Sequence, residues 1–273
     1  MQKLSVILIT LNEEKNIDRC LQSVRWADEI IVVDSYSVDR TVALARQYTE
    51  NVYQNEYAGS TRQMEWGIQH ASGDWILFVD ADEVVSHELA SEIQIILHNP
   101  PPVAGYQILR RPYAFGKWIE HGGWYPDHQF RFFRKDSYTV NHEEVHGGFG
   151  TKGPTGRLQG HVLHYTYPTI YSYVSRMNDY TSLQVSNKLS ANPGTTAKWY
   201  NLLLSPLSHF LRKFLSNKGY KDGFHGFVLA LLDATYTLLL YAKLWEYQMQ
   251  RKEGRGTLPP ITNVELNRLK HHR

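Results

Sequence analysis

Short apolar runs alternate with helix-like segments over the first hundred residues, and this alternation restricts the fold more than any other feature. Runs such as "LSVILIT" are continuous and rich in β-branched residues, as in strands buried on both faces. The segments between them begin at capping residues and carry apolar residues at helical spacing. The alternation predicts an α/β fold, with a mixed, mainly parallel sheet flanked by helices. We expect strands at 4–10, 29–35, 51–55 and 74–80, with helices after residue 12 and near 41–48, 61–71 and 86–97.

The pattern changes after Pro102. Aromatic and glycine-rich segments such as "GYQILRR" and "QFRFFRK" predict short antiparallel strands that extend the same sheet. From about Pro168 helical spacing dominates, with an expected break at Pro206, because proline removes a helix hydrogen bond. We therefore divide the chain into an α/β domain at 1–167, a helical C-terminal region at 168–253 that associates with a membrane or forms a dimer, and a loosely ordered basic tail at 254–273.

Charge and cysteine content exclude several classes of protein. The 273 residues carry 29 Lys and Arg against 27 Asp and Glu, a balance that argues against a nucleic-acid-binding protein. Cys20 is the only cysteine, so no intramolecular disulfide can form and a cysteine-based metal site is implausible. The first apolar run is too short for a signal peptide or a membrane span. We expect a cytoplasmic location.

Polar side chains follow three of the predicted strands, at the point where each strand ends. Ligands of open α/β sheets bind at the carboxyl ends of the strands, so these residues are the first candidates for a site. The three groups come from strands that a parallel sheet brings to one edge. They are Thr10, Asn12 and Glu13 after the first strand, Asp34 after the second, and Asp80 and Asp82 after the fourth.

Asp80 and Asp82 are two residues apart, so on an extended backbone both side chains project to the same side. Two carboxylates that face one point repel each other unless a cation or a proton joins them. Oxygen ligands suit Mg²⁺ or Mn²⁺, with substrate phosphates completing the coordination. The spacing alone is common by chance, but its position after a buried strand favours a metal–diphosphate site over a capped loop.

Asp34 and Arg62 are candidates for contacts to a nucleotide. A carboxylate at position 34 could accept the imide N–H of a uracil, or it could cap the turn that follows its strand. Arg62, at the start of a predicted helix, could reach the base or the diphosphate, or it could be an ordinary surface arginine.

Four stretches together resemble the family-2 glycosyltransferases, which have a GT-A fold and use nucleotide sugars. The resemblance is closest to the branch of bacterial β-glucosyltransferases of the lipopolysaccharide core, and it covers about residues 1–180 well. Tyr36 and Arg40 depart from the residues usual in the family, so the loop after the second strand could have a different shape. The stretches are "SVILITLNEEKNI", "EIIVVDSYSVDRT", "GSTRQMEWGIQHASGDWILFVDADE" and "HEEVHG".

This resemblance implies the identity of the ligand and the role of each strand-end residue. The ligand would be a UDP-sugar, and the domain at 1–167 would be the catalytic GT-A domain. Asp80 would lie at the ribose and metal side, and Asp82 would bind Mn²⁺ or Mg²⁺ directly. The uridine site would be lined by Thr10, Asn12, Glu13, Asp34 and Arg62.

An inverting transfer also needs a base that takes the proton of the acceptor hydroxyl. The segment "NHEEVHGG" is the best source, and a His-Glu pair in the branch resembled favours Glu143 over Glu144, with His142 on the acceptor side. Two adjacent acids in an extended segment point in opposite directions, so at most one should face the acceptor. The alternatives are a solvated acidic loop and a metal site made by His142, Glu143 and His146.

The segment "GWYPDHQFRFFRK" offers further contacts to the two substrates. Sugars stack on aromatic faces, so Trp124 and Tyr125 are candidates for the acceptor side, although packing in the core is an equally good explanation. Arg131 is a candidate for a contact to phosphate.

The segment 224–245 is long enough to span a bilayer, but it contains Asp233 near its middle together with His225 and Lys243. It could be a packed helix, an interfacial helix on an anionic membrane surface, or a true span. Nearby basic residues and the segment "WYNLLLSPLSHFLRKF" favour contact with the inner leaflet.

Together these features predict an inverting, metal-dependent glycosyltransferase, peripheral on the cytoplasmic face of the inner membrane. Its substrates would be UDP-glucose and an inner-core heptose of lipopolysaccharide, a lipid-linked glycan, as the resemblance implies. The acceptor could also be a polyprenyl phosphate or another glycan, and a homo-oligomer is possible. A sugar nucleotidyltransferase would also need a strand-end Asp pair, but with a basic glycine-rich loop where "LNEEKN" is acidic. A non-catalytic membrane-surface binding module would have no need of Asp82 or Glu143.

Overall fold

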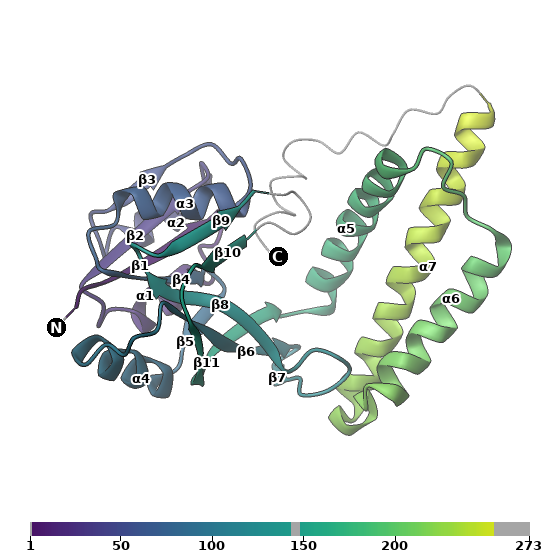
Figure 1. Cartoon of the computed structure of the whole chain (residues 1–273). Coiled ribbons are helices and arrows are strands. Elements are labelled where there is room, and N and C mark those ends of the chain that lie inside the picture. The colour runs from purple at the N-terminus through teal and green to yellow at the C-terminus, as the bar shows by residue number, and fades with distance from the viewer. Residues whose placement is uncertain (1, 143–147, 254–273) are drawn as a thin grey trace. The chain divides into compact units, whose positions relative to one another are not determined.

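The computed structural model describes residues 2–142 and 148–253, which form two compact units (Figure 1). Unit 1 consists of Met1–Arg111 and Pro126–Tyr165. Unit 2 consists of Pro112–Tyr125 and the chain from Thr166 onward. A short segment inside the first 167 residues therefore joins the helical unit.

Unit 1 is built on a mixed sheet whose parallel part comes first in the chain. The four parallel strands are β1 (Leu4–Thr10), β2 (Glu29–Asp34), β3 (Val52–Gln54) and β4 (Trp75–Asp80). The antiparallel part contains β5 (Glu83–Val85), β6 (Gly105–Ala114), β8 (Asp127–Arg134) and β11 (Thr155–Tyr167). The strand order is β3-β2-β1-β4-β8-β6-β11-β5, and a hairpin of β9 (Tyr138–Asn141) and β10 (Gly148–Thr151) lies outside this sheet.

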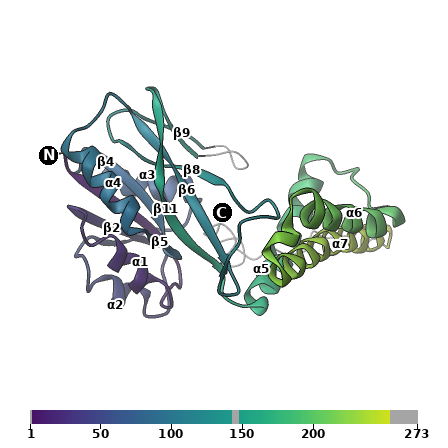
Figure 2. The same cartoon turned by 90° about the horizontal axis from the view of Figure 1, so that it is seen from below.

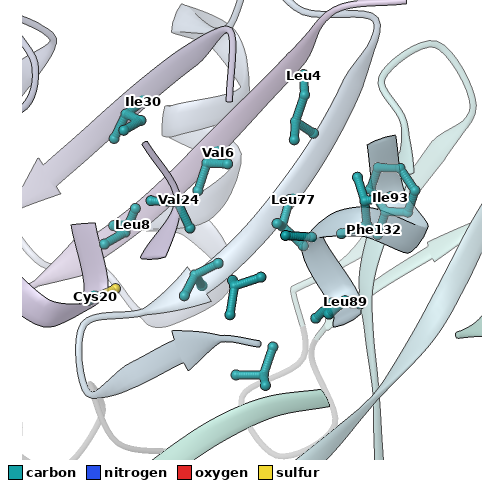
Figure 3. Close-up of a cluster of buried hydrophobic side chains, with 14 of the residues drawn as sticks. Leu4, Val6, Leu8, Cys20, Val24, Ile30, Leu77, Leu89, Ile93 and Phe132 are labelled. Carbon is teal, nitrogen blue, oxygen red and sulfur yellow. The ribbon is translucent and has the colours of Figure 1, made fainter. Parts of the chain in front are cut away.

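Helices cover both faces of the sheet, which explains why its central strands are continuously apolar. Leu4, Val6 and Leu8 of β1 pack in one cluster, shown in Figure 3, with side chains from α1 and α4. Ile7 and Ile9 of the same strand pack on the other face with α3. The alternation of β1 between two buried layers is the arrangement that its sequence predicts. The helices are α1 (Ile17–Ser23), α2 (Thr41–Ala45), α3 (Ser60–His70) and α4 (His87–His98).

Unit 2 consists mainly of helices that run alongside one another (Figure 2). They are α5 (Ile170–Ala191), α6 (Trp199–Leu211) and α7 (Phe224–Lys252). A π-helical turn, Arg212–Ser216, and a 3₁₀ turn, Gly219–Asp222, connect α6 to α7. The expected break at Pro206 was wrong, because α6 continues through this proline and the irregular turn comes only after Leu211.

Asp222 explains why Pro112–Tyr125 belongs to unit 2. Its buried carboxylate accepts hydrogen bonds from the backbone N–H of Glu120 at 3.3 Å and of His121 at 2.8 Å. Lys117, in the short strand β7 (Lys117–Trp118), donates to the backbone carbonyl of Asp222 at 2.8 Å. The segment is thus fixed by a residue about a hundred positions further along the chain.

The polar residues inside α7 also find partners within unit 2. Asp233 accepts a hydrogen bond from the hydroxyl of Tyr173 and lies 3.3 Å from the ammonium of Lys213. Lys243 donates to the side chains of Thr181 and Ser182 of α5. By length and composition α7 could cross a membrane, and 28% of its most apolar window is buried in the protein. Through these polar groups α7 contacts α5 and the π-turn.

Candidate active site

The carboxyl ends of three parallel strands meet at one edge of the sheet of unit 1, which we call the carboxyl edge. Thr10 at the end of β1 lies beside Asp34 at the end of β2. On the other side of β1, Ile9 lies beside Asp80 at the end of β4. The strand order therefore brings together the side chains that the sequence places after separate strands.

Hydrogen bonds join the loops that follow β1 and β2. The backbone N–H of Asn12 donates to Ser37 Oγ at 2.8 Å, and the side chain of Asn12 accepts from the backbone N–H of Val38 at 2.9 Å. The backbone N–H of Glu13 donates to Thr41 Oγ1 at 2.8 Å. Asn12 adopts a left-handed backbone with φ of 55°, a conformation that asparagine tolerates better than most residues. Asn12 and Glu13 thus hold the loop after β2 in place.

Asp34 is fully buried and organises the turn that follows its strand. One carboxylate oxygen accepts from the backbone N–H of Ser37 at 2.9 Å and from the side-chain amide of Gln54 at 3.2 Å. The other oxygen accepts a hydrogen bond from the hydroxyl of Ser37. The geometry therefore shows the turn-capping role, and a carboxylate with about four acceptor positions keeps room for one more donor.

Tyr36 follows directly and is one of the departures from the family pattern. Its backbone is left-handed, with φ of 62°, and its side chain is exposed. Such a conformation is uncommon for an aromatic residue and is often found at functional sites.

Asp80 takes part in a buried ion-pair network. Its carboxylate lies 2.7 Å from a guanidinium nitrogen of Arg131 on β8, and a second nitrogen of Arg131 lies 3.1 Å from Glu83. Glu83 also accepts the backbone N–H of Asp80 at 2.9 Å, and Arg110 lies 3.7 Å from its other oxygen. The network fixes the end of β4 and its turn.

Asp82 lies in the turn between β4 and β5, so the expected alternation along an extended strand does not apply to it. Its carboxylate is 3.3 Å from His164 Nε2 of β11, whereas that of Asp80 is directed to Arg131. The two carboxylates therefore have separate partners.

Burial and neighbouring charges set the pKa values around this network. Burial raises the pKa of Glu83, an effect that Arg131 opposes. Burial alone would lower the pKa of Arg131, but the carboxylates of Asp80 and Glu83 raise it, so the guanidinium stays charged. Cys20 lies underneath, with its thiol 3.4 Å from the backbone carbonyl of Asp80. Burial, followed by the charges of Glu83, Asp82 and Asp80, raises the pKa of this thiol well above its ordinary value.

The residues at the carboxyl edge fit a hard divalent cation as partial ligands. Within residues 2–142 and 148–253 no group of three His, Cys, Asp or Glu side chains could enclose a metal ion. The carboxylate oxygens of Asp82 are donors of the kind that such a cation binds when phosphate oxygens complete its coordination, whereas the Asp80 carboxylate is engaged by Arg131. In the described part of the chain, Thr10 Oγ1 is buried without a hydrogen-bond partner, so this edge offers a buried polar atom to a ligand.

The other predicted site residues lie in several places. Arg62 is exposed in the first turn of α3, and His142 lies 3.2 Å from Glu65 of the same helix. Glu143, the predicted base, lies outside the described residues, as do Glu144 and His146. Trp124 and Tyr125 belong to unit 2, where Trp124 packs edge-on against Tyr167 and Tyr125 against Trp118.

Sequence reasoning missed the importance of Glu83 and His164. Glu83 is opposite His164 in the pairing of β5 with β11, and β5 itself was not expected. The only local signal was the acid directly after the Asp pair. The partners of Glu83 come from positions far along the chain, and no spacing in the sequence connects them to Glu83.

A comparison with protein families decides the class of the chain. Residues 5–153, more than half of the sequence, match the model of "Glycosyl transferase family 2". The chain belongs to glycosyltransferase family 2. The resemblance seen in the sequence is thereby confirmed, and so is the GT-A-like fold with a mixed, mainly parallel sheet. This family 2 glycosyltransferase is therefore an enzyme.

Full-length relatives extend the match into unit 2. The chain is 27% identical over 256 residues to the lipopolysaccharide core biosynthesis glycosyltransferase LpsC of Rhizobium meliloti, covering 89% of this chain and 92% of LpsC. It is 30% identical to an uncharacterized glycosyltransferase of Rickettsia felis, covering 92% of this chain and 93% of that protein. A solved structure, glucosyl-3-phosphoglycerate synthase from Mycobacterium tuberculosis in complex with Mn²⁺ and UDP-glucose, is 25% identical over 40% of this chain and 44% of its own, with a TM-score of 0.36.

Proposed function

We propose that this family 2 glycosyltransferase moves glucose from UDP-glucose, with inversion, to a heptose of the lipopolysaccharide inner core. The observation that carries the proposal is the meeting of Thr10, Asp34 and Asp80, followed by Asp82, at one edge of the sheet. The name of LpsC, a relative along nearly its whole length, supports lipopolysaccharide core as the acceptor class.

The donor would lie across the ends of β1, β2 and β4. Asp34 would accept the imide N–H of uracil with the acceptor position that its turn leaves, and Thr10 Oγ1 is a buried polar atom beside it. Asn12, Glu13 and Arg62 would complete the uridine site. Because Asn12 and Glu13 bond to the loop after β2, uridine binding and loop geometry depend on the same residues.

Asp82, with Asp80, would hold Mn²⁺ or Mg²⁺ next to the diphosphate. When bound, the ion supplies Lewis-acid stabilisation of the charge that develops on the leaving diphosphate. Arg131 keeps the Asp80 carboxylate oriented, and a contact of its guanidinium to phosphate stays a prediction.

The acceptor would be a lipid-linked glycan at the cytoplasmic face of the inner membrane. Glu143 would take the proton from its attacking hydroxyl, with His142 on the acceptor side. Contacts of Trp124 and Tyr125 with the acceptor stay a prediction from the sequence. Formation of a homo-oligomer stays a prediction.

Asp82→Asn tests the metal role, because it removes the negative charge and keeps the shape. Manganese-dependent release of UDP from UDP-glucose should fall on the order of 10²–10³-fold, the usual effect of losing one electrostatic contact to a transition state. Asp74→Asn is the matched control, since Asp74 directly precedes β4 and, among the residues that the structure describes, its carboxylate accepts one exposed backbone N–H, that of Lys3. Equal activity of Asp82→Asn and Asp74→Asn would contradict the proposal. A screen of nucleotide sugars in this assay identifies the donor.

Glu143→Gln tests the base. The variant should lose glucosyl transfer to core acceptors while its affinity for UDP, measured by calorimetry, stays that of the unaltered enzyme, because a base acts on the acceptor. Glu144→Gln is the control at the neighbouring position. If Glu144→Gln loses transfer and Glu143→Gln does not, the base is Glu144 and not Glu143.

A further inference from the structure

Helix α6 presents an apolar side to solvent. Trp199, Leu203, Leu204, Leu207 and Leu211 repeat at helical spacing, and Trp199, Leu203 and Leu207 are 72%, 64% and 55% exposed. We call these five residues the leucine face. Within the part of the chain that the structure describes, no residue of α6 is buried. A surface helix ordinarily turns such residues inward, so the leucine face needs an explanation.

Part of α6 is already used for packing in unit 2. Leu202, Ser205 and His209, on the side away from the leucine face, are half-buried, and so is Phe210 at the border of that face. Phe210 stacks on Phe214 of the following π-turn and meets Phe227 of α7 edge-on, with ring centres 5.9 Å apart. The helix is therefore anchored through its half-buried side. Rotating it to bury the leucine face would break these aromatic contacts.

A similar surface continues on α7, which packs beside α6 in both views (Figures 1 and 2). Phe224, Leu231, Leu238 and Trp245 are spaced seven residues apart, and all four are exposed. An aromatic residue thus stands at one end of the leucine face and at both ends of the stripe on α7. Trp and Tyr concentrate at membrane–water interfaces, where an apolar ring and a polar group are both accommodated.

The charged residues in the stretch of sequence around the leucine face are all basic. From residue 180 to residue 221 the sequence contains six Lys and Arg and no Asp or Glu. Lys198 precedes the leucine face directly, and Arg212 follows it directly. Lys218 and Lys221 lie in the turns that lead to α7 and are exposed. A partner that complements this surface must be apolar at its centre and anionic at its border.

A second copy of the chain meets this requirement poorly. In a two-fold dimer the same surface faces itself, so the cationic borders of the two leucine faces would approach each other without acids to neutralise them. An anionic leaflet supplies acyl chains for the leucines and negative headgroups for the cations. The charge pattern therefore favours lipid over a second copy.

We propose that the leucine face, with Lys198 and Arg212 at its two ends, docks the chain onto a membrane surface that contains anionic lipid. The helix would lie in the interface plane with its apolar side in the headgroup–acyl boundary. This inference is drawn from unit 2 alone; only its purpose, access to a lipid-linked acceptor, rests on the proposed function.

Co-sedimentation of the full chain with vesicles tests the proposal. The chain should bind vesicles of phosphatidylcholine mixed with phosphatidylglycerol, and added salt should weaken binding. Replacing Leu203 and Leu207 together by Ser should weaken binding at least about tenfold, because less apolar surface enters the lipid. Lys198→Gln and Arg212→Gln should each cost about fivefold on anionic vesicles. Ile95→Ser, an exposed apolar residue of α4 in unit 1, should leave binding unchanged.

The outcomes separate this proposal from its alternatives. The substituted side chains are exposed, so the thermal transition of each variant should match that of the unaltered chain; this check removes unfolding as a cause. If the Leu203 and Leu207 variant still binds vesicles as the unaltered chain does, the proposal is wrong. It is also wrong if the unaltered chain is a dimer in sedimentation analysis and this variant is a monomer. UDP affinity, measured without lipid, should be the same in all variants. If the chain binds vesicles but not UDP, the proposed function fails and the docking surface stands.

Discussion

At the scale of single residues, ion pairs between buried side chains hold the residues of the candidate site in position. Arg131 is the clearest case, because it links Asp80 to Glu83 while all three are buried. Removing one partner of a buried ion pair leaves an uncompensated charge, which costs more than the pair itself contributes. The position of Asp80 therefore depends on a residue of a different strand.

Arg131→Met should lower the free energy of unfolding by about 3–5 kcal/mol at neutral pH, measured by urea denaturation. The loss should shrink as the pH is lowered. Without the guanidinium, the pKa of Glu83 rises further in the folded state, so the folded state binds a proton that the unfolded state releases. Arg157→Met, on the exposed part of β11, is the control and should change stability by no more than about 0.5 kcal/mol. A similar small effect in Arg131→Met would show that the network contributes little.

At the scale of elements, the loops after β1 and β2 act as one piece of structure. Backbone N–H groups on both sides, those of Asn12, Glu13, Glu14, Val38 and Arg40, donate to side chains of the other loop or, for Glu13, of the first residue of α2. Asp39 belongs to the same set: burial raises its pKa, but hydrogen bonds from the hydroxyl and backbone N–H of Thr41 lower it more. A substitution in either loop should therefore alter the structure of both loops.

Asn12→Ala and Asn12→Gly separate two contributions of Asn12 to this arrangement. Both lose the hydrogen bond from Val38, worth about 0.5–1.5 kcal/mol. Alanine also carries the penalty of a left-handed backbone, about 1–2 kcal/mol, which glycine avoids. Asn12→Ala should thus be less stable than Asn12→Gly by about that amount in urea denaturation. Equal stability of the two variants would mean that the loop relaxes out of the left-handed conformation.

At the scale of the whole molecule, the strands of the sheet could be predicted from neighbouring residues in the sequence. Contacts between residues far apart in the sequence could not be predicted. The runs at β1 and β4 are continuous and apolar, so their burial on both faces could be inferred from neighbouring residues alone. The joining of Pro112–Tyr125 to unit 2 depends on Asp222, and no pattern in either segment reveals that contact. The same limit applies to the candidate site, where strand ends were predictable but the partners of Asp80 and Asp82 on β8 and β11 were not.

Cys20 gives the whole chain a practical property. It is the only thiol in the sequence, it is fully buried beneath Asp80, and its raised pKa keeps it protonated at neutral pH. Alkylating reagents attack the thiolate, so Cys20 of the folded protein should react with a maleimide only very slowly. A cysteine placed at Leu207 or at Ile95 can then carry a single environment-sensitive fluorophore without first replacing Cys20. The emission of each labelled chain would report, residue by residue, how deeply that position enters a lipid bilayer.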